Sequence, residues 1–151
     1  MKSKLAVVTV ALLLGAVTLD AAAQAKPEVL VKQRQAAMTL QGKYLGPLGA
    51  MAQGKAPFNA QIVQRNAGYL EVLSKMPWDG FDASTKGEKS AALPAIWEKA
   101  GEFKQAQERF ENEAAKLVQV AKSGDEGAIK AQIGATAKSC GGCHENFRQK
   151  N

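Results

Sequence analysis

Hydrophobic residues recur every three or four positions along most of the chain after Lys26, which is the spacing of one face of an α-helix. No stretch shows the apolar and polar alternation, or the density of β-branched residues, that is typical of a strand. The pattern therefore predicts an all-α protein. We expect the first helix to begin at Pro27 and the second to follow Asn59 as its N-cap. Their inner faces are predicted to carry Leu30, Arg34, Ala37, Met38, Gln41, Leu45 and Leu48 in the first helix, and Ile62, Val63, Asn66, Leu70 and Leu73 in the second.

Prolines and polar segments divide the helical pattern. Pro47 is expected to kink or end the first helix, and Pro77 to stop the second, because proline lacks the amide hydrogen that a helix interior needs. Residues 76–92 are rich in Gly, Asp, Ser, Thr and Lys, and this segment is longer than a hairpin between neighbouring helices requires. We expect a crossover loop here, with Trp78 and Phe81 packed on the core rather than binding a ligand.

Two further helices are predicted in the second half of the chain. One starts at about Pro94, and the other opens at a capping box formed by Ser123-Gly124-Asp125-Glu126. Their inner faces are predicted to carry Ile96, Trp97, Phe103, Phe110, Leu117, Val118 and Ala121 in the third helix, and Ile129, Ile133, Ala137, Cys140, His144 and Phe147 in the fourth. Four amphipathic helices with one long connection predict an antiparallel four-helix bundle with one long crossover loop.

The first 25 residues have a different composition. Lys2 and Lys4 precede an apolar run over residues 5–19, and the small-residue segment Ala23-Gln24-Ala25 follows. This order is typical of a secretory signal peptide, whereas the run is shorter than the ~20 apolar residues that cross a bilayer. We expect residues 1–25 to be removed on export to the periplasm. Residues 26–151 would then form one domain without a membrane span.

The distribution of charge along the chain argues against nucleic acid as a partner. The chain carries a formal charge of +6, and removal of residues 1–25 leaves +5. No basic run is interleaved with aromatic residues, so nucleic-acid binding is not expected. A weakly basic surface is compatible with an ordinary solvated protein or with an acidic redox partner.

The candidate chemistry lies near the C-terminus. The chain has two cysteines and one histidine, and all three lie in Cys140-Gly141-Gly142-Cys143-His144. On a helix, positions 140, 143 and 144 project from the same side, so two thiols can meet the two vinyl groups of a porphyrin while the imidazole reaches the iron. This spacing is the attachment signature of c-type haem. We therefore predict one covalently bound haem c, with thioethers at Cys140 and Cys143 and His144 as an axial iron ligand.

Other uses of these residues are less compatible with the sequence. A structural zinc site needs a fourth ligand, and the chain has no further Cys or His. A thioredoxin-like dithiol normally sits at a helix start after a strand, and a disulfide at this spacing within a helix has poor geometry. The only histidine is committed to iron and no free cysteine nucleophile remains, so we do not expect an enzyme based on side-chain acid and base chemistry.

The chain resembles the class II cytochromes c, the cytochrome c′ family. Four segments carry the resemblance: Arg34-Gln35-Ala36-Ala37-Met38, Gly54-Lys55-Ala56-Pro57-Phe58, Pro94-Ala95-Ile96-Trp97, and residues 140–148. It implies that Arg34 and Gln35 hydrogen-bond the haem propionates, although they could be a solvated pair. It also implies that Arg148 lies beside the proximal face of the haem, although Arg148 could instead complement the end of the helix dipole.

Met38 leaves the iron coordination open. In typical members of the family this position holds an apolar side chain that covers a vacant sixth position, so that a five-coordinate iron admits nitric oxide or carbon monoxide. In low-spin members a methionine here is the sixth ligand, which favours plain electron transfer. We favour the five-coordinate form, with electron transfer and nitric oxide binding as its functions. The alternative is a pure electron carrier with His144 and Met38 as axial ligands. The family also implies a homodimer formed through the first two helices.

Overall fold

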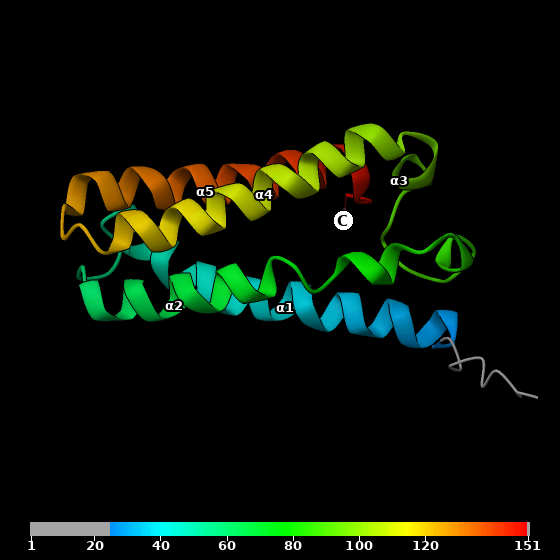
Figure 1. The fold of residues 1–151 in the computed structure, drawn as a ribbon, viewed down its shortest axis with the longest axis horizontal. Coiled ribbons are helices and arrows are strands. Elements are labelled where there is room, and N and C mark those ends of the chain that lie inside the picture. The colour runs from blue at the N-terminus through cyan, green and yellow to red at the C-terminus, as the bar shows by residue number, and fades with distance from the viewer. Residues whose placement is uncertain (1–24, 151) are drawn as a thin grey trace, which may run out of the picture.

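The computed structural model describes residues 25–150, and these form a bundle of helices (Figure 1). The predicted signal peptide, residues 1–25, lies outside the described part except for Ala25. The elements are α1 (Pro27–Ala52), α2 (Ala60–Leu73), the 3-10 turns η1 (Trp78–Phe81) and η2 (Ala83–Thr85), α3 (Ala95–Glu98), α4 (Ala100–Ala121) and α5 (Glu126–Phe147). The prediction of an all-α, four-helix bundle is confirmed.

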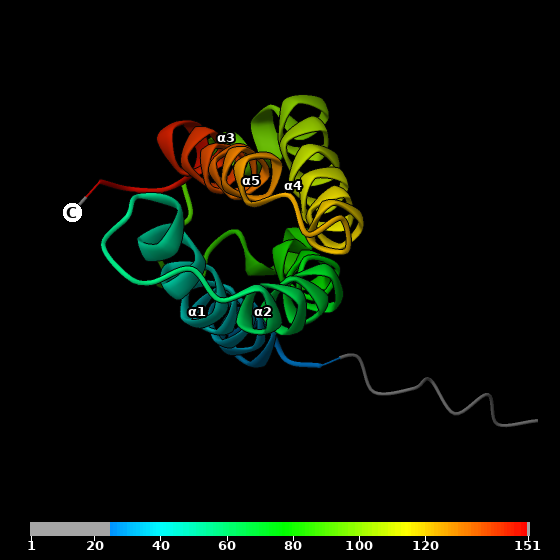
Figure 2. The same ribbon diagram turned by 90° about the vertical axis from the view of Figure 1, so that its left-hand side faces the viewer.

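The four long helices pack in two layers. Helices α1 and α2 form one layer and α4 and α5 the other, and the chain changes layer through the segment that contains η1 and η2 (Figures 1 and 2). Contacts join α1 to α2 and α5, and α4 to α2 and α5. The short connections turn at Gly54 and Gly124, whose φ angles of 70° and 74° suit glycine. Each helix therefore has an antiparallel neighbour in its own layer.

The first helix does not end at Pro47. α1 continues through this proline to Ala52, and Pro47 is exposed on the outer side of the helix. Leu48 and Met51, which follow it, are buried in the core. The prediction that α1 ends at Pro47 is therefore wrong, because core contacts beyond the proline hold the last turns of the helix in place. The second helix begins as predicted, with the Asn59 side chain accepting a hydrogen bond from the Ile62 amide at 3.0 Å.

The predicted third helix is divided. α3 is one turn long, and the backbone leaves the helical conformation at Lys99 (φ −117°, ψ 47°) before α4 begins. The inner face was otherwise predicted well, since Ile96, Phe103 and Phe110 are buried. No proline stands at the break, and Gly101, two residues after Lys99, lies in the first turn of α4.

The cap of the last helix was misassigned. Asp125, and not Ser123, is the N-cap of α5, because its carboxylate accepts a hydrogen bond from the Ala128 amide at 3.0 Å. Glu126 pairs instead with Lys130 one turn along the helix. Ala137 is also exposed rather than inward-facing, because Thr136 and Ser139 occupy the buried side of that turn.

The core has two parts. Leu48, Leu70, Leu117 and Ile133 belong to a larger cluster around the loops that join the helices within each layer. A smaller cluster at the crossover end contains Ile96, Phe103 and Phe147, with Trp78 and Phe81 packed against it. The expected packing of Trp78 and Phe81 on the core is confirmed, and both residues also line cavities beside it. A cavity lies beside this smaller cluster.

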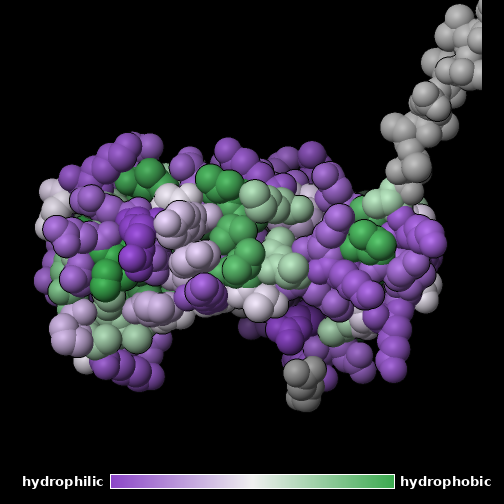
Figure 3. Space-filling view, turned by 90° about the horizontal axis from the view of Figure 1, so that it is seen from below, coloured by the Kyte–Doolittle hydropathy of each residue, from purple (hydrophilic) through white to green (hydrophobic). Residues whose placement is uncertain are grey.

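The outer face of the α1 and α2 layer exposes hydrophobic side chains (Figure 3). Leu40 on α1 is 40% exposed, Tyr69 and Val72 on α2 are 46% and 56% exposed, and Met76 after α2 is 55% exposed. No helix within residues 25–150 is long and apolar enough to cross a membrane.

Candidate haem site

The two thiols and the imidazole lie in the last turns of α5. Cys140 and Cys143 are half-buried and not disulfide-bonded. His144 is exposed, and together with Cys143 it lines a cavity. The chain meets the crossover segment again here, because the Leu93 amide donates to the Phe147 carbonyl and the Gln149 amide to the Ala91 carbonyl. These backbone hydrogen bonds fix the end of α5 against the segment that enters α3.

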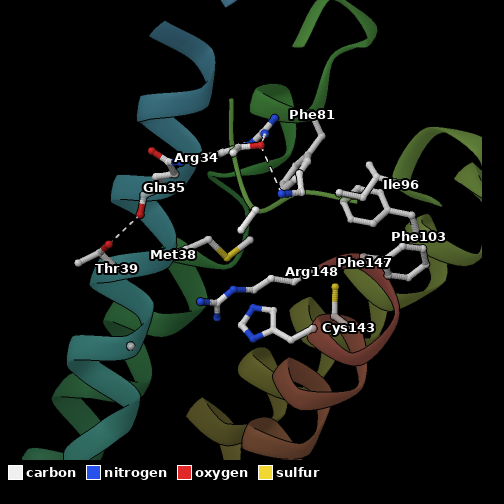
Figure 4. A pocket seen from close by; sticks show the side chains of 15 residues that line it. Arg34, Gln35, Met38, Thr39, Phe81, Ile96, Phe103, Cys143, Phe147 and Arg148 are labelled. Atoms are coloured by element: carbon white, nitrogen blue, oxygen red, sulfur yellow. Dashed lines mark hydrogen bonds between the residues drawn. The ribbon is translucent and has the colours of Figure 1, made fainter. Parts of the chain in front are cut away.

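The cavity has a volume of about 650 Å³, within the range of small-molecule and cofactor sites. It lies between α1 and α5, and its walls also include the crossover segment, α3 and α4. Figure 4 shows its lining, in which Ile96, Phe103 and Phe147 gather on one side and Arg34 lies beside Phe81. The lining residues are Arg34, Gln35, Met38, Thr39, Gly42, Phe81, Ser90, Ala91, Ala92, Ile96, Phe103, Cys143, His144, Phe147 and Arg148.

Met38 forms part of the wall opposite the cysteines. It is half-buried, and it extends from α1 into the space toward α5, whereas Cys143 projects from the α5 side (Figure 4). Met38 and His144 both line this cavity, and they also line a smaller neighbouring one. A flat ligand inserted between the two helices would have one of these side chains toward each face.

Arg34 is buried at the crossover end of the cavity, with 3% of its surface exposed. Its guanidinium donates hydrogen bonds to the Gly80 carbonyl, to Thr85 Oγ1 at 3.0 Å and to Ser90 Oγ at 2.9 Å. It also lies over the Phe81 ring, 4.5 Å from its centroid. None of the ion pairs among the described residues involves Arg34, and burial lowers its pKa. The idea of a solvated Arg34 is therefore wrong.

Gln35 and Arg148 have a different environment from Arg34. Both are exposed and both line the cavity. Arg148 is the C-cap residue of α5, and its amide donates to the His144 carbonyl at 3.3 Å. This position allows its side chain both to line the cavity and to lie at the negative end of the helix dipole, so the two interpretations of Arg148 are compatible.

The ionisable groups of the motif are held in their neutral forms. Burial, and then the neighbouring Cys143, raise the pKa of Cys140 to about 11, and burial raises the pKa of Cys143. Burial lowers the pKa of His144, and the charge of Arg148 lowers it further. A neutral imidazole is the form that ligates a metal.

Comparison with known proteins identifies the family. The family model described as Cytochrome C′ matches residues 29–148, which is most of the chain. The chain belongs to the cytochrome c′ family. A cytochrome c′ of Rubrivivax gelatinosus is 41% identical over 126 residues, which cover 83% of this chain and 98% of that protein. A cytochrome c-554 of Cereibacter sphaeroides is 35% identical over 128 residues, which cover 82% of this chain and 83% of that protein.

Solved structures of cytochromes c′ have the same fold. The structure from Shewanella frigidimarina has a TM-score of 0.81 at 35% identity, covering 84% of this chain and 99% of its own. A nitric oxide complex of a variant from Alcaligenes xylosoxidans has a TM-score of 0.78 at 38% identity, covering 85% and 99% of the two chains.

As a cytochrome c′ family member, the chain binds haem c covalently. The residues that line the cavity fit this group. The Cys143 thiol and a neutral imidazole line this cavity, and the Cys140 thiol lines the smaller neighbouring one. Aromatic side chains pack near the crossover, and a buried guanidinium without a carboxylate partner is available to an anion. The haem propionates are anions of this kind.

Sequence reasoning missed several residues of the site. The Ser90 hydroxyl accepts a hydrogen bond from Arg34. Ile96 and Phe103 line the cavity, although their helical spacing predicted only that they belong to the core. Gln41 was placed on the inner face of the first helix, but its polarity was not given a role. The signal was available, because an amide on an otherwise apolar stripe is costly unless it has a partner.

Proposed function

We propose that this cytochrome c′ family member is a periplasmic haem protein that binds nitric oxide or carbon monoxide at a five-coordinate iron and transfers electrons. Cys140 and Cys143 form the thioethers and His144 is the axial ligand. The observation that carries the proposal is a cavity of about 650 Å³, within the range of cofactor sites, which Cys143 and the chain's only imidazole, His144, line together. Bound haem supplies an iron that gains or loses one electron and takes a ligand at a vacant position.

The remaining polar side chains are proposed to orient the cofactor. Arg34 and Gln35 occupy successive positions of α1, both line the cavity, and they would hydrogen-bond the propionates. Arg34 already makes three hydrogen bonds, and a guanidinium has five N–H groups, so two remain for an anion. Arg148 would lie beside the His144 imidazole. We propose no enzymatic role, since none of these side chains is arranged as a nucleophile with a base.

One comparison favours a five-coordinate iron, because a similar solved structure, of a cytochrome c′ variant from Alcaligenes xylosoxidans, is a nitric oxide complex. One observation favours the alternative, a low-spin electron carrier with His144 and Met38 as axial ligands, because Met38 brings a thioether sulfur to the wall opposite His144.

Gas binding tests the proposed function. We expect the reduced holoprotein to bind one carbon monoxide or nitric oxide per haem in an anaerobic titration followed by absorbance. Met76→Leu, which replaces an exposed methionine after α2, is the control. Met76→Leu should bind like the wild type. A wild-type protein whose spectrum does not change with either gas would contradict the proposal.

We also propose export and dimerisation. The N-terminal residues 1–25 have the composition of a signal peptide, which supports a periplasmic location and redox partner proteins in that compartment. The hydrophobic side chains exposed on α1 and α2 support a homodimer formed through this layer.

A further inference from the structure

A second, smaller cavity of about 140 Å³ adjoins the candidate haem site. Both cavities are lined by Met38, Gly42, Cys143 and His144. The walls of the smaller one are otherwise mainly apolar, with Leu45 from α1, Trp78 from η1 and Phe110 from α4 among them. Apart from His144 and the two thiols, its side chains with polar hydrogens are Gln41, Ser139 and Trp78, and the Trp78 Nε1 donates to the Ser74 carbonyl at 2.7 Å.

Gln41 is the polar side chain with unused hydrogen-bonding capacity. The Ser139 hydroxyl donates to the Thr136 carbonyl at 2.7 Å, so its hydrogen is committed. Gln41 is buried, with 6% of its surface exposed, and its Nε2 donates to the Leu73 carbonyl at 2.8 Å. A carbonyl oxygen only accepts, so the NH₂ end of the amide must face Leu73. Within residues 25–150 this is the one hydrogen bond of the Gln41 side chain, which leaves its second N–H and Oε1 unpaired.

The position of Gln41 places it on the Met38 side of the cavity. Gln41 follows Met38 by three residues on α1, so the two side chains project from the same face of that helix. Both line the smaller cavity, whereas His144 lines it from α5. The amide therefore lies on the wall opposite the axial histidine, one turn from the residue predicted to cover the sixth iron position.

We propose that Gln41 is a specificity-determining residue that donates its unused N–H to a diatomic ligand bound at the vacant iron position. The inference rests on the proposed function, since it requires that this position be open. A neutral hydrogen bond in an apolar cavity stabilises a ligand whose outer atom carries partial negative charge. Gln41 would thus favour polar diatomic ligands, and it would also keep the end of α2 attached to α1.

The test is the C–O stretching frequency of the carbon monoxide complex of the reduced holoprotein. A donor near the ligand oxygen lowers this frequency, so Gln41→Met should raise it and should increase the carbon monoxide dissociation rate about fivefold. Gln132→Met is the matched control. Gln132 is equally buried, its Nε2 donates to Glu113 across the α4 and α5 interface, and it lines neither cavity. The control should have the wild-type frequency and rate.

The outcomes separate the inference from the proposed function. An unchanged stretching frequency in Gln41→Met would show that Gln41 only attaches α1 to α2, and the inference would be wrong while the proposed function stands. Failure of the wild type to bind carbon monoxide would instead contradict the proposed function. If Gln41→Met does not fold, Gln41→Glu replaces it. Its frequency should change with pH as the carboxyl ionises, and a pH-independent frequency would overturn the inference.

Discussion

Arg34 and Gly80 join α1 to the crossover segment at the level of single residues. The Arg34 guanidinium donates to the Gly80 carbonyl, and a Cβ at position 80 would stand 2.6 Å from Arg34 Cβ and 2.8 Å from the Leu30 carbonyl oxygen. Only glycine allows this close approach without displacement of backbone. The position of Phe81 in the cavity wall therefore depends on Gly80, a residue that does not itself line the cavity.

Gly80→Ala should weaken this attachment. We expect the free energy of unfolding of the holoprotein to fall by about 1–3 kcal/mol, as for other insertions into a packed site, measured by urea denaturation. Gly87→Ala is the control, because a Cβ there meets no atom within 4 Å. That variant should be neutral or slightly more stable, since alanine restricts the unfolded chain. Equal effects of the two substitutions would show that the contact at position 80 does not hold the loop.

At the scale of the helix, capping decides where α5 begins. Both Ser123 and Asp125 have side chains that can cap, but the amide of Ala128 donates to Asp125. The Ser123 hydroxyl donates to the Val120 carbonyl at the end of α4 and accepts from the Asp125 amide. Ser123 therefore belongs to the turn between the helices, and Asp125 to the helix.

Substitution of the two residues distinguishes these roles. Asp125→Ala should lower the free energy of unfolding by about 1 kcal/mol, the usual cost of a lost N-cap, whereas Ser123→Ala should cost less than half as much. Thermal unfolding of the two variants beside the wild type measures this difference. A larger loss in Ser123→Ala than in Asp125→Ala would restore the capping box that the sequence suggested.

The sequence was informative where the physics is local. The helical spacing, the Asn59 cap and the Cys140 to His144 motif depend on residues within a turn or two of each other, and the structure has the predicted helices in the predicted order. The continuation of α1 past Pro47 depends instead on the burial of Leu48 in the core. The hydrogen bonds of Arg34 reach residues 46–56 positions away, and no local pattern indicates such partners.

At the scale of the whole molecule, the α1 and α2 layer exposes more large hydrophobic side chains than a solvated helix needs. Leu40, Tyr69, Val72 and Met76 are each at least 40% exposed. Burial of this face against a second copy would remove them from water, as expected of an interface with a hydrophobic centre. The cavity lies between the two layers, so dimerisation through α1 and α2 would leave α4 and α5 facing solvent.

Sedimentation of the holoprotein tests this dimer. We expect the mass of two chains for the wild type and of one chain for Val72→Lys, because a lysine in the interface buries an unpaired charge. Gln105→Lys introduces the same charge at an exposed position of α4 and should remain dimeric. A wild type that sediments as a single chain at every concentration would exclude the interface.

The central claim concerns the iron and Met38, and the spin state of the oxidised protein tests it most directly. Electron paramagnetic resonance and absorbance of the holoprotein should show a high-spin iron in the wild type, and the same spin state in Met38→Leu. This result would mean that the Met38 sulfur covers the sixth position without binding the iron. A low-spin spectrum in the wild type that becomes high-spin in Met38→Leu would contradict the account and identify Met38 as the sixth ligand.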